Sequence, residues 1–170
     1  GGFAHMPNVD GVKWFVEEIF PLIKENIPDL VFYIVGNEPP EDIKSLNSQD
    51  IIVTGYVEDL SPYFDNCRVF VSPLRYGAGV KGKINQSMSY GLPVVTTSVG
   101  AEGMALVDGK NALISDRPEE FADNVVELYR NEQLWSVLSR NSIKNVRENF
   151  SYDMAKETLR EMIDNLRVKS

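Results

Sequence analysis

The sequence is poor in residues that build several common kinds of site. It has one cysteine, Cys67, and one histidine, His5, which excludes an internal disulfide and a four-ligand structural zinc site. A lone cysteine fits a reducing compartment such as the cytoplasm. Basic residues are also scarce, 17 against 25 acidic ones, and the net charge of -8 disfavours broad binding to nucleic acid or to an anionic membrane. An anionic ligand therefore needs a local cluster of positive charge.

Long apolar runs and several catalytic signatures are missing too. No run approaches the roughly 20 apolar residues of a membrane-spanning helix, so we expect no transmembrane segment. The sequence has no Asp-x-Asp pair, no His-Glu-x-x-His and no Gly-x-Ser-x-Gly. We therefore expect no bound metal and no cofactor. The chemistry that remains is metal-free binding of phosphate through backbone N–H groups and lysine.

The chain of 170 residues, 43% of them apolar, is long enough to form one globular domain over residues 1–170. Apolar residues at helical spacing predict a first helix over 12–27, with Asn8 or Asp10 as its N-cap. Further helices are predicted over 41–46, 59–66, 81–90, 118–129, 132–149 and 151–166, and strands over 30–35, 51–55, 69–71, 93–97 and 112–114.

This alternation of strands and helices predicts an α/β fold, a doubly wound, Rossmann-like and mostly parallel sheet with helices on both faces. The continuous apolar run over 30–35 is typical of a strand covered on both faces. If the first strand of the sheet precedes Gly1, only residues 1–4 can supply part of it. Ligands of such sheets bind beyond the carboxyl ends of the strands.

The segment 72–86 (SPLRYGAGVKGKINQ) is the densest candidate site. It combines a strand end, three glycines and the start of a helix, where unpaired N–H groups and the helix dipole favour an anion. Arg75, Lys81 and Lys83 add three cations. We interpret the segment as a phosphate or diphosphate site, against the alternative of a glycine-rich turn with solvated lysines.

Other candidates have simple structural alternatives. Gln86 can hydrogen-bond a pair of ribose hydroxyls or be a surface glutamine. The backbone of Tyr56 and Val57, after a strand end, can pair with a nucleobase, and Tyr56 can equally pack in the core. His5 can serve the ligand site or be a structural histidine.

Three runs in order, 2–10 (GFAHMPNVD), 73–83 (PLRYGAGVKGK) and 91–97 (GLPVVTT) leading to 100–103 (GAEG), resemble the C-terminal, donor-binding half of retaining GT-B glycosyltransferases of family 4, also called group 1 glycosyl transferases. The resemblance covers essentially the whole chain. It implies one half of a two-domain enzyme that moves a sugar from a UDP-, GDP- or ADP-sugar to an acceptor, without a metal and with retention of configuration.

The resemblance also suggests roles for individual residues. It implies that Lys83, helped by Arg75, Lys81 and the backbone of Gly79 and Val80, binds the diphosphate. Gln86 falls where the family has a glutamate on the donor ribose, and Ala78 falls on the other glutamate of the usual pair. An early basic residue of many relatives is missing, and Gly2, Phe3 and His5 occupy that region as candidate donor-site residues.

By the same resemblance, the glycan or lipid-linked acceptor binds mainly to an N-terminal domain outside this sequence, where the catalytic side chains are also expected. The isolated chain is then expected to bind nucleotide with little or no transfer. The implied setting is bacterial polysaccharide synthesis in the cytoplasm, at the inner membrane through the other domain. Two rival interpretations are a non-catalytic nucleotide or sugar-phosphate binding module and a degenerate interaction domain.

Overall fold

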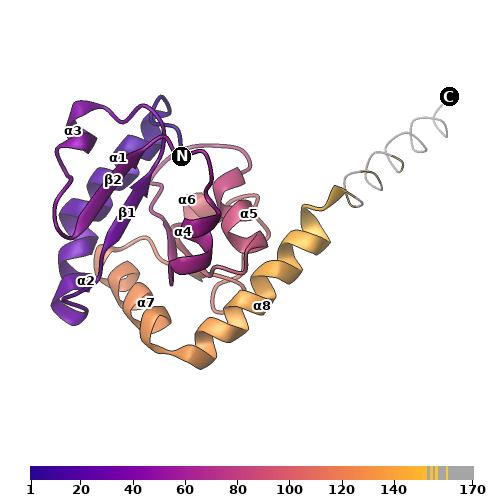
Figure 1. Cartoon of the computed structure of the whole chain (residues 1–170). Coiled ribbons are helices and arrows are strands. Elements are labelled where there is room, and N and C mark those ends of the chain that lie inside the picture. The colour runs from indigo at the N-terminus through magenta and orange to yellow at the C-terminus, as the bar shows by residue number, and fades with distance from the viewer. Residues whose placement is uncertain (153, 155, 157–159, 161–170) are drawn as a thin grey trace.

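The computed structural model describes residues 1–152, 154, 156 and 160 (Figure 1). Strands and helices alternate along the chain, and each strand pairs with parallel neighbours. The predicted Rossmann-like α/β fold is confirmed. The helices after the first are α3 (Glu41–Lys44), α4 (Ser61–Asn66), α5 (Gly82–Ser89), α6 (Ser98–Ala101), α7 (Pro118–Arg130) and α8 (Glu132–Asn149).

The first helix begins earlier than predicted and is interrupted. It consists of α1 (Met6–Trp14), a π-helical turn η1 (Phe15–Ile19) and α2 (Phe20–Asn26). Pro21 has no N–H to donate to the carbonyl of Glu17, which explains why the regular hydrogen-bond ladder is broken just before it. The prediction that Asn8 or Asp10 caps this helix is wrong, because His5 holds the N-cap position and Asn8 lies in the first turn.

The five strands form two parallel sheets instead of the expected single one. One pairs β1 (Phe32–Val35) with β2 (Ile51–Gly55), and the other has the order β3-β4-β5 (Phe70–Ser72, Val94–Thr96 and Leu113–Ile114). The N–H groups of Phe32 and Gly36 donate toward β2, so the carbonyl of Val35 faces the opposite edge of β1. There it accepts a hydrogen bond of 2.7 Å from the amino group of Gly1. The N–H of Phe3 also donates to the carbonyl of Asn37, just after β1, at 3.2 Å. Residues 1–4 thus hydrogen-bond along this edge.

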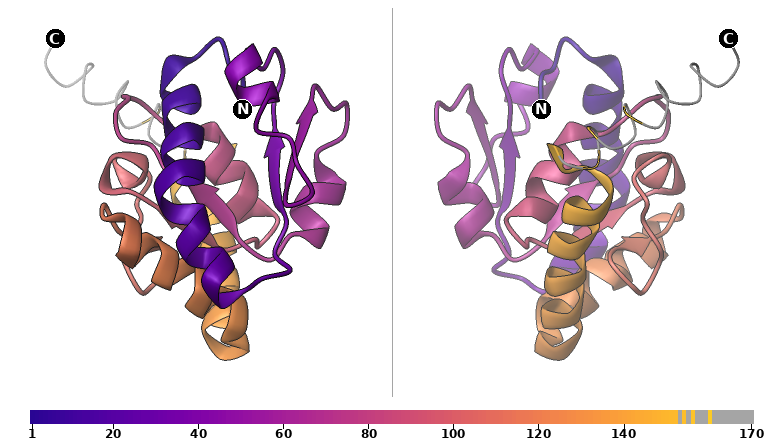
Figure 2. Two further views of the ribbon diagram at one scale, coloured as in Figure 1. Left: turned by 90° about the vertical axis from the view of Figure 1, so that its left-hand side faces the viewer. Right: turned by 90° about the vertical axis from the view of Figure 1, so that its right-hand side faces the viewer.

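Helices cover both faces of the sheets (Figure 2). The long helix α1–α2 lies in front in one view, and α8 lies in front in the opposite view. The main core joins residues of the first helix, β1 and α7, with Phe15, Ile19, Ile23 and Phe121 almost completely buried. A second cluster lies under α5 and contains Ile84, Met88, Val94, Met104 and Ala112.

The prediction differs from the structure at the strand over 30–35 and at α6. The run over 30–35 is not covered on both faces, because Tyr33 is 43% exposed. The ring of Tyr33 packs edge-on with that of Tyr63, with ring centroids 5.8 Å apart. Helix α6 was not predicted; the side chain of Thr97 caps it by accepting from the N–H of Gly100. Most of the helix predicted over 151–166 lies outside the described residues.

Candidate functional site

The strand-to-helix loop after β3 and the start of α1, with its N-cap His5, line a hollow of about 220 Å³. It lies beyond the carboxyl end of β3, the end at which parallel sheets bind ligands. We call it the Lys83 hollow. Its lining residues are His5, Pro7, Asn8, Leu74, Tyr76, Gly77, Ala78, Val80, Lys81, Gly82 and Lys83.

Glycines allow this arrangement in two places, the loop after β3 and helix α1. Gly77 and Gly79 take positive φ angles of 134° and 81°, which let the loop turn back toward the start of α5 at little cost. Gly11 lets α1 approach the loop, because a Cβ built there would lie 2.6 Å from the carbonyl oxygen of Pro73. Helix α1 therefore contacts the backbone just after β3, and its first turn reaches the hollow.

Lys83 lies in the first turn of α5 and lines the hollow. Its Nζ donates to Oδ1 of Asn8 over 2.5 Å. Burial disfavours the charged ammonium and lowers the pKa of Lys83 to about 8. A bound anion would stabilise the ammonium form of this lysine and so raise its pKa again.

Lys81, at the N-cap position of α5, is the second lysine of the hollow. Its side chain is 7% exposed. Its Nζ donates to the carbonyl oxygen of Glu102 at 3.2 Å, which ties the loop to the segment after α6. The backbone N–H of Lys81 is directed to Sδ of Met104, at the same distance of 3.2 Å. Lys81 thus both lines the hollow and holds the loop in place.

Arg75 pairs with Asp10 on α1 and does not line the hollow. Its Nε and Nη2 donate to the two carboxylate oxygens of Asp10 on α1, at 2.9 and 2.5 Å. Its guanidinium carbon lies 5.7 Å from the ring centroid of Trp14. The hydrogen bond from Arg75 lowers the pKa of Asp10 below its usual value. Arg75 lies outside the lining of the hollow, so the structure does not bring all three predicted cations together.

The remaining predicted residues separate into two groups. His5 and Val80 line the hollow, whereas Gly79, Gln86 and the largely exposed Tyr56 lie outside its lining.

The other candidates are Gly2 and Phe3, before α1, and Val57, just after β2. The carbonyl of Gly2 accepts from Asn8, while the side chain of Phe3 is buried in the main core. Val57 is partly buried just after β2. Sequence reasoning did not assign Asn8 to the site, although the run 2–10 that contains it was singled out.

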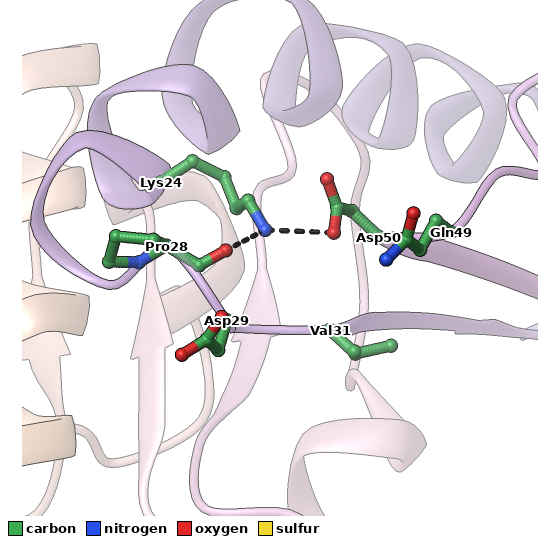
Figure 3. A pocket seen from close by; sticks show the side chains of 6 residues that line it. All are labelled: Lys24, Pro28, Asp29, Val31, Gln49 and Asp50. Atoms are coloured by element: carbon green, nitrogen blue, oxygen red, sulfur yellow. Dashed lines mark hydrogen bonds and ion pairs between the residues drawn. The ribbon is translucent and has the colours of Figure 1, made fainter.

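A second hollow lies at the opposite ends of the strands (Figure 3). Its lining residues are Lys24, Pro28, Asp29, Val31, Gln49 and Asp50. There Nζ of Lys24 is paired with the carboxylate of Asp50 at 2.9 Å and also donates to the carbonyl of Pro28. The charge of Lys24 is therefore compensated by a carboxylate. The charges of the lysines in the Lys83 hollow are not, because no carboxylate lines that hollow.

Within the described part of the chain, no three His, Cys, Asp or Glu residues gather as a possible metal site. None of the helices described there has the length and apolar character to cross a bilayer.

Known proteins resemble this chain over most of its length. The family profile described as "Glycosyl transferases group 1" matches residues 1–131. The chain belongs to the group 1 glycosyl transferases. A relative from Klebsiella pneumoniae, described as an uncharacterized 44.6 kDa protein in the cps region, is 27% identical over 159 residues. The match covers 88% of this chain and 41% of that protein, so the chain spans less than half of that relative.

Solved structures of glycosyl transferases share the fold. The C-terminal domain of the group 1 protein LpcC from Francisella tularensis superposes with a TM-score of 0.71 at 18% identity, covering 84% of this chain and 80% of that domain. Anabaena HepE, solved in complex with UDP-glucose, gives a TM-score of 0.68 at 15% identity and covers 85% of this chain and 44% of that protein. The fold of this group 1 chain is therefore that of glycosyltransferase domains.

Proposed function

We propose that this chain is the donor-binding half of a glycosyltransferase and that the Lys83 hollow binds the diphosphate of a nucleotide sugar. One observation carries the proposal: two lysines line a hollow without any carboxylate, in a chain whose net charge is -8. Such a hollow favours an anion where the rest of the chain repels it. Membership of the group 1 family and the UDP-glucose bound to HepE support a nucleotide sugar as that anion.

In this proposal the protein stabilises the leaving diphosphate. As the bond from the sugar to the diphosphate breaks, negative charge grows on the phosphate oxygens. The ammonium groups of Lys81 and Lys83 and the N–H groups of Gly82 and Lys83, the first two residues of α5, are proposed to stabilise that charge without reorganising. Transfer without a metal and with retention of configuration is part of the proposal.

The rest of the donor is assigned to neighbouring positions. Gln86, one turn along α5 from Lys83, is proposed to bind the ribose, and the backbone of Tyr56 and Val57 to bind the base. His5 lines the hollow and is proposed to lie near the donor sugar. The glycan or lipid-linked acceptor is proposed to bind the other half of the enzyme, in the cytoplasm at the inner membrane, and the Klebsiella relative of the cps region supports a role in polysaccharide synthesis.

Thermal-shift titration of the chain with UDP, GDP and ADP tests nucleotide binding and identifies the base. A ligand that binds the native state raises the melting temperature, so at least one nucleotide is expected to do so. Lys83→Ala is expected to remove this shift, whereas Lys110→Ala, on an exposed turn, keeps it. In the complete enzyme, Lys83→Ala is expected to lower turnover sharply and Lys110→Ala is not. Equal behaviour of the two variants would refute the assignment.

A second function has one observation in its favour. Ala78 lines the hollow at a position where the family resemblance implies a glutamate, which would suit a module that binds a nucleotide or sugar phosphate without transferring the sugar. Turnover by the complete protein separates the two functions. Nucleotide binding with no transfer to any acceptor would favour the module.

A further inference from the structure

The partner of Lys83 is a neutral amide whose two ends are both engaged. Oδ1 of Asn8 accepts from Nζ of Lys83 at 2.5 Å, and Nδ2 of the same side chain donates to the carbonyl of Gly2 at 2.7 Å. The bond to Gly2 fixes which end of the amide faces the lysine, because only Nδ2 can donate to a carbonyl. Asn8 therefore presents its oxygen to Lys83.

Among the residues that the structure describes, no carboxylate lines the hollow beside this lysine. The lining of the hollow contains no Asp or Glu. Asp10, two residues after Asn8 in α1, forms an ion pair with Arg75. Glu102 contributes its backbone carbonyl to Lys81, and its side chain is exposed. Pairing with a carboxylate would compensate the charge of this partly buried lysine. An amide oxygen restrains the ammonium group and leaves its charge uncompensated.

We propose that Asn8 is a positioning residue, which holds Lys83 at the hollow in a form that can give its whole charge to the diphosphate. The inference rests on the proposed function of the hollow and adds to it the residue that prepares the lysine. Charge-assisted hydrogen bonds to phosphate are stronger than neutral ones, and donors that are held in position beforehand form them without the cost of reorganisation. The close approach of α1 at Gly11 brings Asn8 into place for this role.

The test replaces the amide by a carboxylate of nearly the same shape. Asn8→Asp keeps the acceptor toward Lys83 but adds a negative charge beside the bound anion and loses the bond to Gly2. Inorganic pyrophosphate is the probe, because it needs no base or ribose contacts. By calorimetry at about pH 7, we expect Asn8→Asp to bind pyrophosphate about tenfold or more weakly.

Asn66→Asp is the matched control. Nδ2 of Asn66 also donates to a backbone carbonyl, that of Pro62, at 2.7 Å, and the substitution changes the net charge equally. Asn66 lies at the end of α4, outside the lining of the hollow, so its variant is expected to bind pyrophosphate like the parent chain.

The pH profile separates positioning from a structural role. The other titratable groups near Lys83 are His5, Tyr76 and Lys81 in the hollow and the amino group of Gly1. Burial, and to a lesser extent the charge of Lys83, lower the pKa of that amino group to about 6. A new carboxylate at position 8 stabilises the ammonium form, so the alkaline midpoint of binding is expected to move up in Asn8→Asp. A purely structural role would lower the melting temperature and leave this midpoint where it is.

Asn8→Ala provides a second variant. It adds no charge, so it is expected to weaken pyrophosphate binding severalfold with no upward shift of the midpoint. If the parent chain binds pyrophosphate and both variants match it in affinity and pH profile, the role of Asn8 is overturned and the proposed function stands. If the parent chain binds neither pyrophosphate nor any nucleoside diphosphate, the proposed function itself fails.

Discussion

Arg75 and Asp10, 65 residues apart in the sequence, form a two-pronged ion pair between the loop after β3 and helix α1. The plane of the guanidinium matches the two oxygens of the carboxylate, which makes the pair geometrically specific. Arg75 also lies over the ring of Trp14. The pair joins the two segments that enclose the Lys83 hollow.

This geometry predicts different effects for two basic residues of the same loop region. Lys83→Ala removes a charged donor from the hollow and is expected to weaken UDP binding about tenfold to a hundredfold. Arg75→Ala is expected to weaken it less than threefold and to lower stability by at most about 1 kcal/mol, because the pair is partly exposed. Calorimetry and thermal unfolding of both variants measure these effects. A larger loss of affinity in Arg75→Ala would place the guanidinium on the ligand.

Nucleotide binding is expected to weaken as the pH rises above about 8, because Lys83 then loses its proton. Titration with UDP from about pH 7 to about pH 9.5 covers a range in which its terminal phosphate stays ionised. Lys83→Arg, whose guanidinium stays charged, is expected to flatten the profile. A decline that persists in this variant would assign the titration to another group.

The lowered pKa of Lys83 also predicts how the free energy of unfolding depends on pH. The pKa of Lys83 is lower in the folded chain, about 8, than in the unfolded chain, about 10.4. Between these values the unfolded chain binds more protons, so this group makes the free energy of unfolding rise with pH. Chemical denaturation of the parent chain and of Lys83→Arg at several pH values isolates the contribution, which the variant is expected to lack.

Gly11→Ala is expected to lower the free energy of unfolding by up to about 2 kcal/mol. Alanine favours a helix over glycine by roughly 1 kcal/mol, but its Cβ would meet the carbonyl oxygen of Pro73 at 2.6 Å and force α1 away at a cost of about 1 to 3 kcal/mol. Gly82→Ala, at a helical position where a Cβ meets nothing within 4 Å, is the control and is expected to be neutral or stabilising. Denaturant unfolding compares the two, and a stabilised Gly11→Ala would show that the contact relaxes freely.

Gln86→Ala tests the ribose assignment by comparing two ligands. If Gln86 contacts the ribose, the variant is expected to lose severalfold in affinity for UDP and none for pyrophosphate, since a lost neutral hydrogen bond costs about 1 kcal/mol. Calorimetry with both ligands gives the comparison. Equal affinities of parent and variant for UDP would leave Gln86 as a surface glutamine.

Sequence patterns predicted those features that depend on neighbouring residues. The strand over 51–55 and the helix over 132–149 are found with the predicted bounds, because apolar periodicity and the cap at Asn131 act locally. The start of the first helix was misplaced, since Asn8 has the residue type of a cap but its side chain is engaged by Lys83 from α5. Distant contacts of this kind leave no mark on local spacing.

The candidate site divides in the same way. The composition and the glycine-rich run 73–83 were sufficient to expect a fold, a sheet end and a group of cations, because these follow from residue type and order along the chain. Only the tertiary structure decided that Arg75 pairs with Asp10 and that the partly buried Lys83 lies beside Asn8. Partner choice and desolvation depend on which segments meet in space, and a close approach such as that at Gly11 becomes visible only when the chain is folded.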